Sequence, residues 1–187
     1  MHKIQLVISS VRASRIGDQI AGWIVDQAAG VPTLDIDLVD LRDWHLPMDD
    51  EPLQPKQYPA MDSYQNDHSR AWSRKVQEAA GFVFLLPQYN WGYPASLKNA
   101  LDHLYHEWAD KPAVIVTYGS RGGGKAADQL VQVMQGIHLN PVATRPALPL
   151  KEAAYTEAGR LADPATAFSE QKDEVVTALQ ELSQALD

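Results

Sequence analysis

Three short stretches of the sequence group hydroxyl, guanidinium, aromatic and glycine residues that could bind a ligand. The first is "SSVRASRIG", Ser9 to Gly17, which offers the hydroxyls of Ser9, Ser10 and Ser14 and the guanidinium groups of Arg12 and Arg15. A helix is expected to start near Ser14, and its free N–H groups would complete the donors that a phosphate monoester needs. The alternative is that Ser14 only caps this helix and that the two arginines are solvated.

The second stretch, "PQYNWGYPASLKNALDHLY", carries aromatic side chains on a tight turn. Tyr89, Trp91 and Tyr93 alternate with Asn90 and Gly92, directly after an apolar run that ends at Pro87. A turn that presents aromatic and amide groups together suits a flat heteroaromatic ring.

The third stretch, "GSRGGGKAAD", nearly matches the phosphate-binding pattern G-x-x-x-x-G-K-[ST]. Ala126 stands where that pattern needs a hydroxyl to hold Mg²⁺, and the loop follows the fourth expected strand rather than the first. An ATP or GTP hydrolase is therefore disfavoured. We expect Gly122 and Gly123 to bring backbone N–H groups to the edge of a flat ring, and Lys125 to begin a helix without facing the ligand.

These stretches follow expected strands of an α/β protein. Apolar runs predict strands, of which the run at 34–41 alternates with Asp35 and Asp37 as an edge strand does. Strands alternating with helices imply a parallel sheet covered on both faces, here five-stranded in the order 2-1-3-4-5, a three-layer sandwich. Its ligand would lie beyond the carboxyl ends of the first, third and fourth strands. The strands are expected at 4–8, 34–41, 81–87, 113–118 and 141–145, and the later helices at 67–80, 95–108, 125–136 and 164–186.

Composition limits the class of protein. The 187 residues suit one domain spanning 1–187, and a net charge of −8 favours neither nucleic acid nor an anionic membrane surface. The absence of cysteine excludes disulfides and thiolate metal sites, and no apolar run reaches membrane-spanning length. We therefore expect a cytoplasmic protein that binds a small molecule, with no nucleic acid or membrane partner.

In their order and on these loops, the three stretches resemble the NAD(P)H-dependent FMN reductase family of flavodoxin-like enzymes, which includes quinone and azo-dye reductases. The resemblance runs from Ile4 to about Arg145 and implies tightly bound FMN, NAD(P)H as reductant, and a homodimer or homotetramer. It assigns no catalytic side chain and no metal ligand. It implies that the FMN phosphate is bound by Ser9, Arg12, Ser14, Arg15 and Ile16. The ribityl chain and ring would be bound by Pro87, Gln88, Tyr89, Asn90 and Trp91. The pyrimidine end of the ring would be bound by Ser120, Arg121, Gly122 and Gly123.

The resemblance leaves two alternatives open. Gln88 replaces the glutamate common in the family, which could alter hydrogen bonding near the flavin. The first functional hypothesis is an enzyme that reduces a quinone, azo compound, free flavin or metal ion by a ping-pong sequence. Its alternative is a flavodoxin-like electron carrier or redox sensor that binds FMN without NAD(P)H turnover.

Two further features have ordinary explanations beside functional ones. The long segment Arg42 to Asn66 is either a surface excursion held by its own aromatic residues or a flap or subunit arm. His103 and His106, with Glu107, lack a third ligand in the sequence. A solvated or interface helix face explains them better than a metal site.

Overall fold

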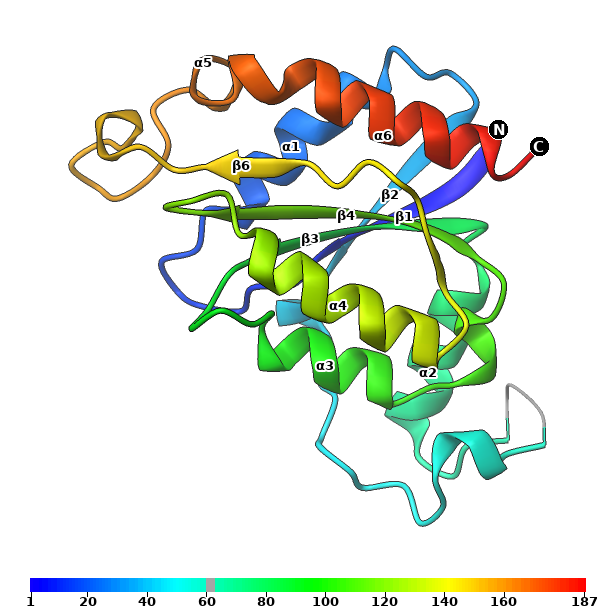
Figure 1. The fold of residues 1–187 in the computed structure, drawn as a ribbon. Coiled ribbons are helices and arrows are strands. Elements are labelled where there is room, and N and C mark those ends of the chain that lie inside the picture. The colour runs from blue at the N-terminus through cyan, green and yellow to red at the C-terminus, as the bar shows by residue number, and fades with distance from the viewer. Residues whose placement is uncertain (60–62) are drawn as a thin grey trace.

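The computed structural model describes residues 1–59 and 63–187, and it is built around a parallel sheet of six strands. The order along the sheet is β2-β1-β3-β4-β5, with β6 also paired to β4, which confirms the predicted order 2-1-3-4-5 (Figure 1). The strands are β1 His2–Ile8, β2 Leu34–Asp40, β3 Gly81–Pro87, β4 Pro112–Gly119, β5 Asn140–Pro141 and β6 Ala147–Pro149.

The fifth position of the sheet differs from the prediction of one strand over 141–145. Two short strands share it: β5 pairs with the start of β4 and β6 with its end. Between them the chain leaves the ladder, because Thr144 bonds to Glu181 through its N–H at 2.8 Å and its hydroxyl at 2.6 Å. The pairing resumes after Pro146, whose carbonyl accepts the N–H of Thr117 at 3.0 Å.

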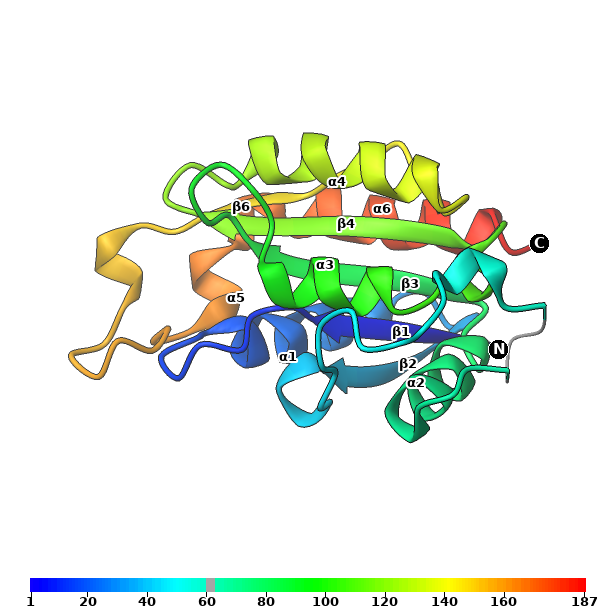
Figure 2. The same ribbon diagram turned by 90° about the horizontal axis from the view of Figure 1, so that it is seen from below.

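Helices cover both faces of the sheet, as expected of a three-layer sandwich (Figure 2). α1 and α6 pack on one face with side chains such as Leu6 and Val83, and α2, α3 and α4 pack on the other with Val7 and Phe84. Alternate residues of each central strand enter opposite cores, which is why these strands are continuously apolar. The helices are α1 Gly17–Ala28, α2 Asp67–Gln77, α3 Ala95–Asp102, α4 Gly124–Gly136, α5 Pro164–Ala167 and α6 Lys172–Gln184.

Two predicted helices are interrupted. The helix predicted over 95–108 ends as α3 at Asp102, because buried Glu107 accepts hydrogen bonds from the N–H of Tyr105 at 3.3 Å and the hydroxyl of Ser73 at 2.6 Å. A short 3-10 turn, His106–Trp108, then inserts Trp108 into the core. The closing helix predicted over 164–186 is broken between α5 and α6, where fully buried Phe168 packs 5.4 Å from Trp23.

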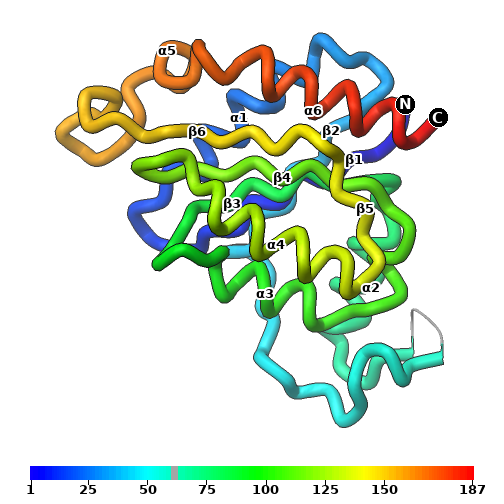
Figure 3. Tube along the Cα trace, viewed as in Figure 1, coloured from blue at the N-terminus to red at the C-terminus, as the bar shows by residue number. Residues whose placement is uncertain are grey.

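The two chain ends lie side by side at one end of the sheet (Figure 3), where His2 and Asp187 approach to 3.8 Å. Within the described residues no helix is both long and apolar enough to cross a bilayer.

The described part of the long segment Arg42 to Asn66 is packed by its own side chains; residues 60–62 of this segment lie outside the description. Tyr58 and Tyr64 are buried with ring centroids 4.7 Å apart. Glu51 accepts hydrogen bonds from Tyr58 at 2.6 Å and from the N–H groups that precede α2. Burial alone would raise the pKa of Glu51, but these hydrogen bonds outweigh it and hold that pKa below its usual value. The segment thus has the packing of the surface-excursion alternative.

Candidate functional site

The loops after β1, β3 and β4 converge at the carboxyl edge of the sheet, at the left of Figure 1. They enclose a cavity of about 260 Å³. All these strands are parallel, but the order in which they are added to the sheet reverses between β1 and β3, and doubly wound sheets bind their ligands at such a point. The lining residues are Ser10, Arg12, Ser14, Arg15, Ile16, Pro87, Gln88, Tyr89, Tyr118, Gly119, Leu150 and Tyr155.

The sequence predicted seven of these lining residues, and the structure brings them together from the first two loops. They are Arg12, Ser14, Arg15, Ile16, Pro87, Gln88 and Tyr89. The other predicted residues lie beside the cavity rather than along it: Ser9, Asn90, Trp91, Ser120, Arg121, Gly122 and Gly123.

Four lining residues were missed, and Ser10 was named for its hydroxyl but not assigned to a part of the cofactor. Gly119 stands inside the third quoted stretch, so the sequence held a signal for it. Tyr118 reads as the last apolar residue of a strand. Leu150 and Tyr155 follow β6, beyond the end of the resemblance, and only the fold places them here.

The part of the cavity that the resemblance assigns to the phosphate lies at the start of α1. Ile16 occupies the N-cap and provides no side-chain cap; the N–H of Gln19 donates to the carbonyl of Ile16 at 3.0 Å, which leaves the N–H of Gly17 for another acceptor. Ser14 and Arg12 are exposed beside it on the cavity wall. An uncapped helix start flanked by a hydroxyl and a guanidinium fits a phosphate group.

Arg15, which the resemblance assigns to the phosphate, lines the cavity but already has partners within the protein. Its side chain is 8% exposed and donates to both carboxylate oxygens of Asp40 and, at 2.9 Å, to the carbonyl of Ser10. Asp40 also accepts the N–H of Arg42 at 2.9 Å, and Arg42 donates to the carbonyl of Arg12. Arg15 therefore ties the phosphate loop to the end of β2, which leaves Arg12 as the guanidinium available to an anion.

Substitution of Arg15 should lower stability, whereas substitution of Arg12 should weaken FMN binding. We expect Arg15→Ala to lose about 2–4 kcal/mol of unfolding free energy, because it leaves the Asp40 carboxylate without its main partner. Arg12→Ala should change stability by less than about 0.5 kcal/mol and weaken FMN binding about 10–100-fold through loss of a charged hydrogen bond. Urea unfolding and flavin fluorescence titration measure the two effects.

Arg74→Ala is the matched control, since Arg74 is an exposed arginine on α2. Undiminished flavin affinity in Arg12→Ala would contradict the assignment of the phosphate to this loop.

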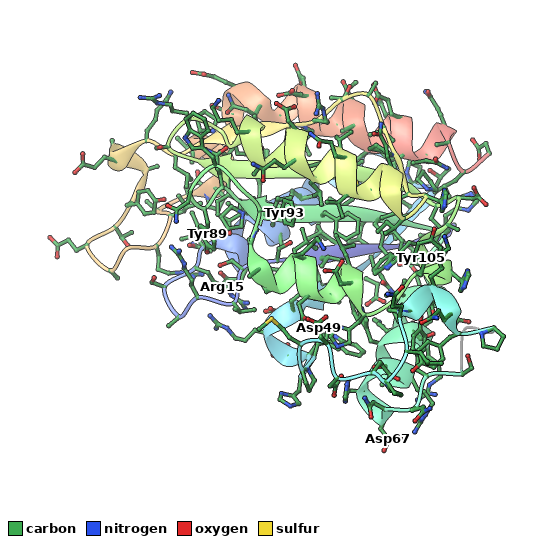
Figure 4. All side chains as sticks on the ribbon, turned by 60° about the horizontal axis from the view of Figure 1, so that its bottom comes forward. Arg15, Asp49, Asp67, Tyr89, Tyr93 and Tyr105 are labelled. Carbon is green, nitrogen blue, oxygen red and sulfur yellow. The ribbon has the colours of Figure 1, made fainter. Side chains whose placement is uncertain are left out.

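Tyr89 and its neighbours form the part of the wall that the resemblance assigns to the ring. The Tyr89 hydroxyl lies 2.7 Å from Oγ of Ser10, and the Arg12 guanidinium lies 3.6 Å from the centroid of the Tyr89 ring. Figure 4 shows Tyr89 and Arg15 near one another at the loop end of the sheet. Burial raises the pKa of Tyr118, which keeps this phenol a neutral donor across the usual pH range.

Gln88 performs a task that a glutamate could also perform. Its side-chain oxygen accepts the N–H of Ala126 at 3.2 Å, in the first turn of α4, where Gly123 offers no side-chain cap. A carboxylate would accept the same bond and gain from the helix dipole. The replacement of the family's usual residue therefore preserves the connection between the β3 loop and α4.

Asn90 and Trp91 form the tip of a tight turn, in which Tyr89 and Gly92 exchange hydrogen bonds of 2.8 and 2.9 Å. Both tip residues have positive φ, 48° and 72°, as a type I′ turn requires at its two central residues. Trp91 is 64% exposed, and Nζ of Lys125 lies 3.8 Å from its ring centroid. Lys125 is thus engaged by an aromatic ring at the rim.

The glycines of the third loop are required by close packing. A Cβ on Gly122 would lie 3.0 Å from that of Ala147, and one on Gly123 would lie 2.9 Å from that of Thr117. The N–H of Gly122 closes the turn by donating to the carbonyl of Gly119 at 3.0 Å. Gly119 is the member of this loop that lines the cavity.

The far wall is a segment we call the strap, residues 150–161, which carries Leu150 and Tyr155. Arg160 fastens it to the phosphate loop by donating to the carbonyl of Arg15 at 2.7 Å and to the carboxylate of Asp18 at 2.6 Å. The Arg160 guanidinium holds the pKa of Asp18 below its usual value. Leu161 and Gln19 exchange two further hydrogen bonds of 2.9 Å, so the strap closes over the start of α1.

Residues 2–153 match the NADPH-dependent FMN reductase family. The chain belongs to this family. It is 43% identical over 185 residues to the NAD(P)H-dependent FMN reductase C4B3.06c of Schizosaccharomyces pombe. This alignment covers 99% of this chain and 90% of that protein. It is 36% identical over 108 residues to an NADPH:quinone oxidoreductase of Arabidopsis thaliana, covering 55% of this chain and 50% of the other. Among solved structures, the Paracoccus denitrificans flavoenzyme FerB, an NAD(P)H:(acceptor) oxidoreductase, superposes with a TM-score of 0.69 at 19% identity, over 96% of this chain and 98% of the other.

As a member of the NADPH-dependent FMN reductase family, the chain is an FMN-dependent oxidoreductase that uses NAD(P)H. The family assignment gives no support to the alternative of an electron carrier without NAD(P)H turnover. It also agrees with the rejection of an ATP or GTP hydrolase, because the glycine-rich loop follows β4.

Proposed function

We propose that the protein is a two-electron quinone reductase that works by a ping-pong sequence on FMN held in the cavity at the β1, β3 and β4 loops. The observation that carries the proposal is one open cavity whose wall combines the start of α1 with tyrosine side chains from the loops after β3 and β6 and from the end of β4. Bound FMN supplies the redox chemistry, accepting hydride from NAD(P)H and passing the electrons to the acceptor.

The residues of the chain bind and orient the cofactor. Arg12, Ser14 and the first turn of α1 would hold the phosphate, while Pro87, Gln88 and Tyr89 would run along the ribityl chain and ring. Because the N–H of Gly122 is used within its turn, the donor expected at the ring's pyrimidine edge falls to Gly123. Such a donor would stabilise the negative charge that ring reduction creates.

A quinone fits the exposed side of this site better than a charged acceptor. Tyr89, Tyr155 and Leu150 supply apolar surface along the cavity, and the relative from Arabidopsis thaliana is named as a quinone oxidoreductase. Both NAD(P)H and a quinone would use the same open side, so the first must leave before the second binds. This shared position predicts ping-pong kinetics.

Stopped-flow absorbance under anaerobic conditions tests the proposal. We expect NADPH or NADH to bleach the flavin. Subsequent mixing with 1,4-benzoquinone should restore the flavin colour in a separate phase. Steady-state rates at several quinone concentrations should give parallel double-reciprocal lines. A flavin that NAD(P)H does not bleach would refute the reductase, and intersecting lines would refute the ping-pong order.

We also infer that the active form is a cytoplasmic homodimer or homotetramer. The family resemblance supports assembly, and the exposed Trp91 at the rim provides apolar surface that a second subunit could cover. The absence of cysteine is compatible with a reducing compartment. Sedimentation velocity of the flavin-loaded protein measures the assembly.

A further inference from the structure

Three side chains from distant parts of the sequence meet on the α2 and α3 side of the sheet, away from the flavin cavity. They are Asp50 of the long segment, His68 in the first turn of α2, and His103 at the C-cap of α3. One ligand atom from each lies within 4.8 Å of the other two. Asp49 and Asp67, the chain neighbours of two members, lie at the lower side of the molecule in Figure 4, well apart from Tyr89.

A hydrogen bond fixes His103 in a tautomer that can bind a metal through Nε2. Its Nδ1 lies 2.8 Å from the carbonyl oxygen of Asn99, and because a carbonyl only accepts, Nδ1 carries the proton. In the neutral ring, Nε2 then holds a free lone pair. A metal-binding histidine is oriented in this same way, by donating its other ring N–H to a carbonyl.

The free nitrogen of His103 is buried without a partner. The residue is 6% exposed, and Nε2 accepts no hydrogen bond from the described residues. A buried polar atom without a partner costs about 1–3 kcal/mol. A cation placed between His103, His68 and Asp50 would remove this cost.

The other two ligands can move toward such a cation. Nε2 of His68 lies 3.0 Å from Oδ1 of Asp50, and their side chains are 24% and 33% exposed. The His68 and His103 rings stand 5.9 Å apart at 71°. Bonds of about 2.0–2.2 Å to nitrogen and oxygen therefore require only side-chain rotation. In the present contact Nε2 of His68 donates to the Asp50 carboxylate, so binding of the metal at Nε2 moves that proton to Nδ1 of the same ring through solvent.

A cavity of about 250 Å³ adjoins the cluster and is lined by His103, Asp102 and the residues from Asp49 to Pro55. It leaves an open side for water in the remaining coordination position. Two imidazoles and one carboxylate suit zinc and its neighbours, whereas magnesium and calcium prefer oxygen ligands alone.

We propose that Asp50, His68 and His103 form a binding site for a divalent transition metal of the zinc type, which fastens the long segment to α2 and α3. The sequence predicted no metal site, because the candidate ligands that it suggested, His103 and His106 with Glu107, lacked a third ligand. His106 is exposed and its Nε2 lies 3.3 Å from the carbonyl of Lys56, while the Glu107 carboxylate is occupied by Ser73 and Tyr64. The three ligands come from separate elements, so no spacing motif could indicate them.

Calorimetric titration of the tag-free, flavin-loaded protein with ZnCl₂, after removal of metals with a chelator, tests the site. We expect one Zn²⁺ per chain. Asp50→Asn and His68→Ala should each weaken binding by more than about tenfold, since even outer-shell partners of metal ligands are worth about 10–100-fold. Both positions are partly exposed, so these variants should fold.

His106→Ala is the matched control and should leave the Zn²⁺ affinity unchanged. A second readout is hydrogen exchange, in which Zn²⁺ should slow exchange over residues 48–57 in the wild type and not in His68→Ala. No binding heat in the wild type, undiminished affinity in both ligand variants, or an equal loss in His106→Ala would each overturn the site. Flavin absorbance should be the same in all variants, which separates this test from that of the reductase.

Discussion

Trp108→Ala should lose about 3–5 kcal/mol of unfolding free energy, which places it among the most destabilising single substitutions in this fold. Trp108 is fully buried, with its ring 5.2 Å from that of Phe82 and 6.3 Å from that of Trp72. Its indole N–H also donates to the carbonyl of Leu101 at 3.1 Å. The substitution removes the ring from the core between α2, α3 and the sheet, and leaves that carbonyl without its partner.

The control is Trp91→Ala, which removes the same side chain from a position that is 64% exposed. We expect its stability to stay within about 0.5 kcal/mol of the wild type. Urea unfolding followed by circular dichroism measures both variants. Similar losses of unfolding free energy in the two variants would contradict the view that burial of the tryptophan determines its contribution to stability.

Gly123→Ala should combine a loss of stability with a loss of flavin. Gly123 has φ of 91°, and an added Cβ would meet the Cβ of Thr117 at 2.9 Å and its hydroxyl oxygen at 3.2 Å. Strained backbone costs about 1–3 kcal/mol and overpacking a similar amount, so we expect about 2–6 kcal/mol in total. Thr117 belongs to β4, at the centre of the sheet, so α4 rather than the strand must shift. We expect that shift to weaken FMN binding at least tenfold, or about 1.4 kcal/mol.

Gly124→Ala tests the same loop without the clash. Gly124 begins α4 and has no atom within 4 Å of an added Cβ. Alanine at this place should keep the flavin and leave stability equal or higher, because alanine favours helices by up to about 1 kcal/mol over glycine. Flavin fluorescence titration and urea unfolding of the pair give the result. Normal flavin affinity in Gly123→Ala would contradict the part given to the third loop.

The centre of the fold could be predicted from the sequence because its strands are simple. The run at 81–87 is continuously apolar and forms β3 over the predicted residues, buried on both faces. The order of the strands followed from the alternation at 34–41, which places β2 at the edge. The burial within β2 follows the predicted alternation less well, because Leu38 is 52% exposed whereas Val39 is buried.

Elements that end through distant contacts could not be predicted in this way. α3 stops before Trp108 because Glu107 binds Tyr64 and Ser73, which come from the long segment and from α2. The fifth strand splits because Glu181 of α6 binds Thr144. Hydrophobic spacing near residues 95–108 is the same whether the helix continues or ends.

The candidate site shows the same division. Loops with distinctive residues supplied Arg12, Ser14 and Tyr89, and the fold brings these to one cavity. The ion pair of Arg15 with Asp40 could not be predicted, because Asp40 reads as one more acidic residue of an edge strand. A guanidinium that braces a loop and one that binds a phosphate look alike in sequence.

The strap has a consequence for the order in which the protein is made. The three ligand-binding loops leave the ribosome in the sequence β1, β3, β4, and by then the sheet is nearly complete. The wall carrying Leu150 and Tyr155 is fastened only when Arg160 reaches Asp18 and the carbonyl of Arg15. We therefore expect the proposed flavin site to be completed only at the final stage of synthesis, since a chain that stops after β6 would form its sheet but lack one wall of the cavity.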